Sequence, residues 1–137
     1  MLKRSSRDTP EDVAAGARPG WEGLRVWWLL DRDNAGTRSL VVNTTTFPPG
    51  KLHELHRHPN AEEVLYIVSG QGIHLSEGAP VRQVAGEAVH IPAGEWHGFA
   101  NDGDEPAIIY AVFGGVSRYS DAGYEVHPNQ PPGIPQL

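Results

Sequence analysis

Short β-prone runs separated by turn residues constrain the fold of this chain more than any other feature. From Trp21 onward, clusters of Gly, Pro, Asn and Asp recur about every eight to twelve positions, a spacing typical of a β-sandwich or barrel. The 16 glycines and 12 prolines are spread along all 137 residues, so helices of ordinary length have few places to form. The sequence therefore predicts one all-β domain.

Nine runs between the turn signals are rich in β-branched, aromatic and aliphatic residues, and each is predicted as a strand. They are Leu24–Leu30, Ser39–Phe47, Leu52–His58, Val64–Ser69, Gly72–Leu75, Val81–Val84, Ala88–Ile91, Gly98–Asn101 and Ala107–Phe113.

The two ends of the chain differ from this central region. Residues 1–20 are polar and carry Pro10 and Pro19, which predicts a mostly flexible N-terminal arm. Residues 21–126 form the single predicted barrel domain. Residues 127–137 form a proline-rich tail that should be extended and either loose or draped over a neighbour. The arm lacks the apolar run of a secretory signal, so we expect a cytoplasmic location.

The charge balance argues against two classes of partner. Lys and Arg total 11 against 17 Asp and Glu, a formal net charge of −6, and no basic cluster interrupts that acidity. Nucleic acid and anionic membranes are therefore not expected to bind. No stretch approaches the ~20 apolar residues of a membrane span, so the expected partner is a small-molecule substrate.

Seven histidines and no cysteine mean that any metal here must be held by nitrogen and oxygen. His56 and His58 lie two apart on a predicted strand, so their side chains share one face and can chelate one ion. If the next strand folds back as the antiparallel neighbour, Glu63 comes beside this pair and Glu62 faces solvent. His97 follows a rigid Pro-Ala-Gly turn far along the chain.

These residues stand in a pattern that resembles the cupin family. The first cupin motif runs G-x5-H-x-H-x4-E-x6-G, and the second runs G-x5-P-x-G-x2-H-x3-N. Both motifs match without adjusting a gap, and ten chance matches at ordinary residue frequencies would be extremely rare. The matching positions are Gly50, His56, His58, Glu63 and Gly70 for the first motif, and Gly86, Pro92, Gly94, His97 and Asn101 for the second.

The resemblance covers about Leu40 to Phe113, and the short segment between the motifs is similar to that of compact microbial single-domain cupins. It implies a double-stranded β-helix, which is a jelly-roll barrel with a metal inside one mouth. It also implies that His56, His58, Glu63 and His97 bind one divalent transition metal ion: Fe, Mn, Ni, Co or Zn.

Other polar residues near the motifs are candidates for the pocket. Glu54 has the strand parity of His56 and is predicted, with Glu63, as a catalytic acid or base, whereas His53 has the opposite parity. His74 and His90 lie within barrel strands, where each is either a pocket residue or a hydrogen-bonded structural histidine. Trp96 and Phe99 flank His97 and are predicted to wall the pocket.

Adjacent tryptophans in the first strand suggest a partner. Trp27 and Trp28 must point to opposite faces, so one is in the core and the other is exposed or covered. This predicts a homodimer in which the N-terminal strand or the tail of one subunit packs on the other.

Several activities are consistent with such a site, because fold alone does not determine function. We expect a metal-dependent enzyme that acts on a small aromatic, enolic or polyketide-like molecule, with a dioxygenase of the quercetinase-like or diketone-cleaving kind first. The alternatives are a non-redox, zinc-type cyclase or isomerase of the polyketide-cyclase kind, and a non-catalytic binding cupin.

Overall fold

The strands of the structure match those predicted from the turn pattern. The computed structural model describes residues 1–137, and each of the nine predicted strands is present with ends that differ by at most two residues. They are β1 (Arg25–Leu30), β2 (Leu40–Phe47), β3 (Leu52–Arg57), β4 (Glu62–Ser69), β5 (Gln71–Ser76), β6 (Val81–Val84), β7 (Ala88–Ile91), β8 (His97–Ala100) and β9 (Ala107–Gly114).

Four short elements were not predicted as such. A 3-10 turn, η1, covers Ala15–Ala17, and α1 (Arg32–Ala35) lies between the first two predicted strands. Asp31 starts α1 by accepting hydrogen bonds from the backbone of Asp33 and Asn34, which is the usual chemistry of a helix N-cap. Near the C-terminus lie α2 (Tyr119–Ala122) and the two-residue strand β10 (Glu125–Val126).

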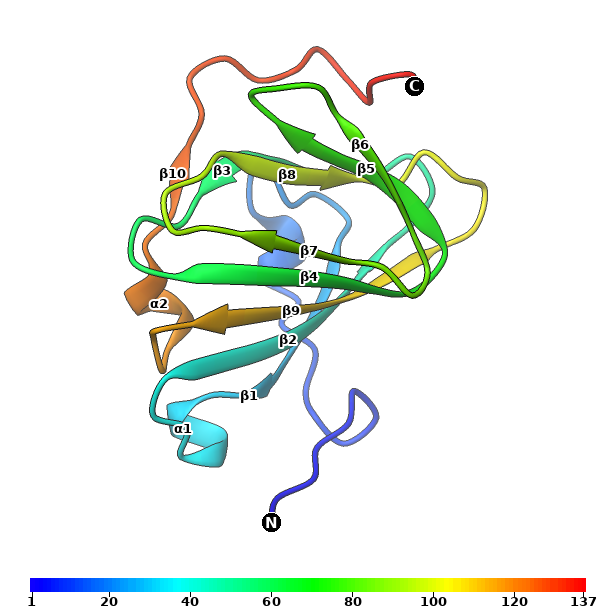
Figure 1. Ribbon diagram of the computed structural model, residues 1–137. Helices are drawn as coiled ribbons and strands as arrows, with labels where there is room; N and C mark the ends of the chain where they lie inside the picture. Colours follow the sequence, from blue (N-terminus) through cyan, green and yellow to red (C-terminus); the bar gives the residue numbers. More distant parts are fainter.

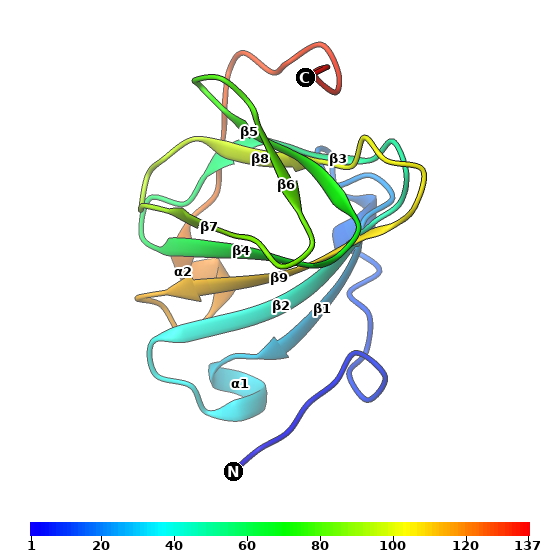
Figure 2. The same ribbon diagram turned by 45° about the vertical axis from the view of Figure 1, so that its right-hand side comes forward.

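Two antiparallel sheets of five strands face each other (Figures 1 and 2). The first sheet has the order β1-β2-β9-β4-β7 and the second β10-β3-β8-β5-β6. From β2 to β10 the chain crosses from one sheet to the other at every step except between β5 and β6. This exchange confirms the predicted jelly-roll, or double-stranded β-helix.

The interior between the sheets is filled by side chains that alternate along each strand. Ile67 of β4, Ile109 of β9 and Phe99 of β8 are each at most 2% exposed, and Phe47 contacts Phe99 edge to face with ring centroids 5.0 Å apart. A second cluster of Leu55, Ile73 and Leu75 lies on the outer side of the second sheet. The period of two therefore places apolar groups on both faces of that sheet.

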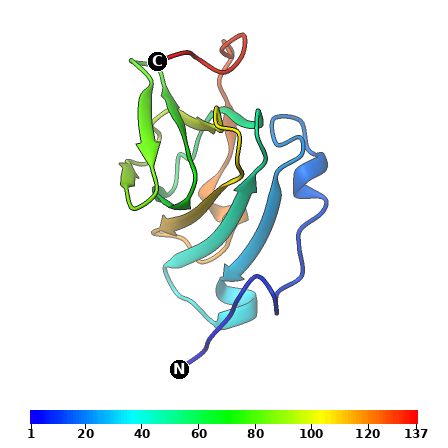
Figure 3. The same ribbon diagram turned by 90° about the vertical axis from the view of Figure 1, so that its right-hand side faces the viewer.

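The second half of the N-terminal arm contacts the barrel. Asp12 donates its backbone N–H to Val26 of β1, its carboxylate accepts from the Trp28 indole, and Ala15 is fully buried. These contacts hold the second half of the arm along β1 (Figure 3). The arm was predicted as flexible from its small and polar residues alone. Its partners lie elsewhere in the chain, so its own composition did not indicate these contacts.

The proline-rich tail, residues 127–137, packs against the barrel of the same chain. The side chain of Gln130 pairs with both backbone groups of Leu55 in β3, and Ile134 packs against the outer apolar cluster. The tail therefore covers the outside of the second sheet.

The helices of the structure are all too short to span a membrane.

Candidate metal centre

Strand β3 brings two of the predicted ligands to the interior. The Nδ1 atom of His56 lies 2.7 Å from the Glu54 carbonyl oxygen, and that of His58 lies 2.6 Å from the Gly123 carbonyl oxygen. A carbonyl oxygen can only accept, so both Nδ1 atoms carry the proton and donate it. Both Nε2 atoms therefore present lone pairs to the interior, which is the form that binds a metal.

The third histidine comes from the neighbouring strand. His97 at the start of β8 is the direct cross-strand partner of His56, and their ring centroids lie 4.3 Å apart. Gly94 in the preceding turn has a φ of 80° and donates its N–H to the His58 carbonyl, which ties that turn to β3. His97 Nδ1 donates to the Glu95 carbonyl at 2.9 Å, so its Nε2 atom also faces inward.

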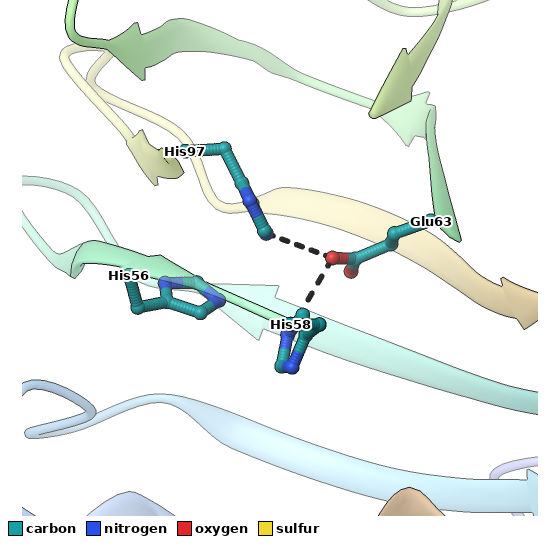
Figure 4. A group of neighbouring side chains, drawn as sticks. All are labelled: His56, His58, Glu63 and His97. Atoms are coloured by element: carbon teal, nitrogen blue, oxygen red, sulfur yellow. Dashed lines mark ion pairs between the residues drawn. The ribbon is translucent and has the colours of Figure 1, made fainter. Parts of the chain in front are cut away.

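The carboxylate reaches the histidines from the opposite sheet. Glu63 Oε2 lies 2.8 Å from His97 Nε2 and 3.7 Å from His58 Nε2 (Figure 4). Glu63 lies beside the histidines, as predicted, but the prediction assumed that β4 pairs with β3, and it does not. Strand β4 lies in the first sheet, and Glu63 reaches across the space between the sheets. Glu62 faces solvent, as predicted.

The four groups fit a divalent metal ion. One ligand atom from each of His56, His58, Glu63 and His97 lies within 4.8 Å of the others, and each residue is at most 5% exposed. Glu63 Oε2 and His97 Nε2 are buried and, apart from their 2.8 Å contact with each other, have no hydrogen-bond partner. Buried polar atoms that lack partners are costly, and a shared cation would satisfy both.

The protonation of the histidines agrees with this role. Burial, reinforced by the neighbouring imidazoles, holds the pKa of His56 well below its ordinary value. Burial also lowers the pKa of His58, although the Glu63 carboxylate opposes this shift. For His97, burial acts against protonation, but the carboxylate of Glu63 and the carbonyl of Glu95 outweigh it, so its pKa is raised. A proton and a metal would compete for the place between His97 and Glu63.

A small cavity adjoins the four ligands. The space that the centres of water molecules can occupy is about 30 Å³, enough for roughly two or three waters. Apolar side chains from both sheets form most of the remaining wall. Besides the four ligands, the lining residues are Trp21, Asn43, Thr45, Phe47, His53, Leu65, Gly98, Phe99, Ile109, Ala111, Phe113 and Tyr119.

The parity argument for His53 and Glu54 is wrong, because β3 is irregular between His53 and His56. The pairing of β3 with β8 shifts register there, so residues three apart turn to the same side. His53 consequently lines the cavity and lies with its ring centroid 4.1 Å from that of His56. Glu54 lies outside the cavity lining, against Gly20.

A group that we call the Tyr124 cluster, made of Trp21, His53, Glu54 and Tyr124, lies beside the ligands. The Tyr124 hydroxyl donates to Glu54 Oε1 at 2.9 Å and accepts from Trp21 Nε1 at 3.1 Å. It also lies 3.1 Å from His53 Nε2. The hydroxyl has one proton, which it gives to Glu54, so His53 Nε2 donates to it. No local sequence signal indicated Trp21, Tyr119 or Tyr124, because each comes from an end of the chain.

The remaining predicted pocket residues separate into inner and outer positions. Phe99 lines the cavity, and His74 is buried with its ring parallel to that of His97 at a centroid distance of 6.4 Å. His90 and Trp96 do not agree with the prediction. His90 lies on the outer face of β7, paired with Glu62 at 2.8 Å, and Trp96 lies outside beneath Arg57. Strand parity turns His90 outward, and the turn before β8 does the same for Trp96.

The fold and the four converging ligands define a cupin. Residues 43–113 match the family model described as Cupin domain, and the chain belongs to that family.

Among individual proteins, the chain is 30% identical over 112 residues to an oxalate-binding protein from Thermotoga maritima, covering 82% of this chain and 92% of that protein. It is 28% identical over 114 residues to Protein SchB from Streptomyces halstedii, covering 83% and 80%. It is also 30% identical over 97 residues to oxalate decarboxylase OxdC from Bacillus subtilis, but spans only 25% of that protein.

Solved structures show the same fold. A predicted oxalate decarboxylase from Thermotoga maritima aligns with a TM-score of 0.74 and 23% identity, covering 84% of this chain and all of that one. The polyketide cyclase RemF from Streptomyces resistomycificus aligns with a TM-score of 0.74 and 22% identity, covering 92% of this chain and 85% of that one.

Proposed function

We propose that the protein is a metal-dependent enzyme that acts on a small organic molecule, with dioxygenase activity on an enolic substrate as the leading candidate. The observation that carries this proposal is the convergence of three inward-facing Nε2 atoms and one carboxylate at a buried cavity. His56, His58, Glu63 and His97 would hold the ion. A divalent metal there would polarise a substrate oxygen and, when redox-active, react with dioxygen.

The residues of this chain supply the rest of the chemistry. Glu63 turns Oε2 toward His97 and His58, which leaves Oε1 to accept the proton of an enol or phenol. Glu63 is therefore the proposed base, since Glu54 is engaged by Tyr124 away from the cavity. The apolar walls, including Phe99 and Phe113, hold the body of the substrate and exclude water from the reacting atoms.

A non-redox cyclase or isomerase is the second candidate. The imidazole-rich ligand set suits zinc as well as iron, and tetracenomycin polyketide synthase protein TcmJ from Streptomyces glaucescens is 28% identical over 81 residues. In this alternative the same Glu63 proton transfer operates without oxygen. A non-catalytic binding protein is the third outcome, in line with the name of the Thermotoga maritima relative.

Oxygen uptake with defined metals separates these functions. Metal-free protein is reloaded with iron, manganese, nickel, cobalt or zinc and incubated with 1,3-diketones, catechols and flavonols. The dioxygenase proposal expects oxygen consumption that His97→Ala abolishes while circular dichroism stays native, with His90→Ala as the matched surface control. Product formation with zinc and no oxygen uptake would favour the cyclase or isomerase, and binding without turnover for every metal would favour the binding protein.

The homodimer and the cytoplasmic location stay predictions. Trp28 is held by Asp12 of the same chain and Trp27 is half-buried, whereas Tyr66 and Tyr110, which are cross-strand partners on the same sheet, are 42% and 40% exposed. Such an outward aromatic pair favours association. Light scattering over a hundredfold range of concentration should give twice the chain mass, and a constant monomer mass would exclude the dimer.

A further inference from the structure

The wall of the metal cavity contains neither lysine nor arginine. Among its lining residues the one carboxylate is that of Glu63. Arg57, which lies between His56 and His58 in the sequence, points to the outside, where it pairs with Glu125 and stacks over Trp96. The positive charge that a ligand can meet inside the cavity therefore comes from the metal alone.

The charges at the centre can be counted from its hydrogen bonds. Each of the three histidines is neutral when its Nδ1 proton goes to a backbone carbonyl and its Nε2 lone pair goes to the metal. A divalent ion and the Glu63 carboxylate together then leave one positive charge. A singly charged ligand neutralises this charge, whereas a doubly charged ligand leaves an uncompensated negative charge in a buried space, which is costly.

The neutral polar groups of the wall cannot replace the missing cation. Asn43 Oδ1 accepts from Thr45 Oγ1 at 3.3 Å, so the Asn43 amide N–H groups are left to donate to a ligand, and the Tyr119 hydroxyl, which is buried without a partner, is a second neutral donor in the wall. A neutral amide contributes one or two ordinary hydrogen bonds and no compensating charge. Most of the other groups around the ligands are apolar side chains such as Leu65, Ile109 and Phe113.

From these observations we infer that the site selects small, singly charged oxygen chelators, such as an enolate or a monocarboxylate, and discriminates against dianions such as oxalate. This inference rests on the proposed function, since it needs a metal at the four ligands. It assigns to the cavity wall a selectivity that differs from the ligand named for the oxalate-binding relative.

The test compares oxalate with oxamate, which has nearly the same size and chelating geometry but one negative charge. Both are titrated into cobalt(II)-loaded protein, and binding is followed by the visible absorption of cobalt and by calorimetry. The ratio of the oxamate affinity to the oxalate affinity is then divided by the same ratio measured for free cobalt(II) ions in water. We expect the protein to shift this ratio toward oxamate by about tenfold or more, because a buried uncompensated charge is costly. An unshifted ratio, or a shift toward oxalate, would overturn the inference.

A charge variant supplies an independent check. Thr45→Lys places a cation in the cavity wall and should move the ratio back toward oxalate, whereas Thr46→Lys, at the next residue and outside the lining, should leave it unchanged. If Thr45→Lys does not fold, the wild-type comparison still decides. Acetylacetone and pyruvate then distinguish an enolate from a monocarboxylate. Cobalt binding that His97→Ala leaves unchanged would overturn the proposed function together with this inference, whereas bound cobalt with an unshifted ratio would overturn the selectivity alone.

Discussion

The metal centre and the Tyr124 cluster lie side by side but are held in different ways. Each ligand histidine of the centre gives its Nδ1 proton to a backbone carbonyl, so its orientation follows from the path of the main chain. The Tyr124 cluster is held by side chains, because Trp21, His53 and Glu54 all meet one hydroxyl. The candidate metal centre is therefore shaped by its own strands, whereas the cluster joins Trp21 and Tyr124, from opposite ends of the chain, to β3.

The largest effect is expected when the candidate metal centre itself loses a ligand. His97→Ala removes one ligand and leaves Glu63 Oε2 without its nearest partner. The affinity for zinc or cobalt, measured by calorimetry, should fall by more than the ~10–100-fold typical of a lost outer hydrogen bond. His90→Ala, on the outer face, should bind zinc or cobalt with the affinity of the wild type. Equal affinity in both variants would show that the metal lies elsewhere.

The next prediction concerns His74, a neighbour of the centre whose Nδ1 atom is buried without a partner. Burial, with a smaller effect of His97, lowers the pKa of His74 from 6.5 to about 4. The unfolded chain therefore takes up this proton first, so the contribution of neutral His74 to stability is complete above pH 6.5 and is lost as the pH falls to about 4. At about 1.4 kcal/mol for each pKa unit, this contribution is roughly 3 kcal/mol.

Urea unfolding of metal-free protein measures that contribution. Between pH 7.5 and 4.5 the wild type should lose more free energy of unfolding than His74→Gln, whereas His90→Gln should follow the wild type. Parallel curves for the wild type and His74→Gln would show that His74 is not buried as a neutral group.

A third prediction separates the two regions directly. Tyr124→Phe removes the hydroxyl shared by Trp21, His53 and Glu54, and the free energy of unfolding should fall by about 1–3 kcal/mol. Because the ligand histidines keep their backbone partners, metal affinity should change less than tenfold. The control is Tyr110→Phe, whose side chain is exposed. A loss of metal binding in Tyr124→Phe as large as in His97→Ala would mean that the regions act as one unit.

The smallest expected effect lies outside both regions, in the tail. Gln130→Ala removes the two hydrogen bonds between the Gln130 amide and Leu55, and stability should fall by about 1 kcal/mol. Metal affinity should not change, since Leu55 points away from His56. Thermal unfolding and calorimetry measure the two quantities, with the exposed Gln136→Ala as the control. A weaker metal site in Gln130→Ala would show that the tail positions β3.

The sequence alone was sufficient for the strands, the jelly-roll fold of the cupin family and the four side chains that gather at the candidate metal centre. The alternation of side chains along a strand and the turn chemistry of glycine and proline act over a few residues, so they can be recognised without knowing where the strands go. The motif spacing around His56, His58 and His97 belongs to this local information. It also placed Glu62 in solvent.

The tertiary structure decided how these parts meet. Glu63 reaches the histidines from the opposite sheet, and one irregularity in β3 brings His53 rather than Glu54 to the cavity. The Tyr124 cluster joins residues 103 apart in sequence, from Trp21 to Tyr124. Sheet membership, register shifts and long-range contacts depend on the packing of the whole chain, since their energies come from surfaces that touch only after folding. The local motif spacing therefore identified the candidate metal ligands, and only the assembled barrel determined what surrounds them.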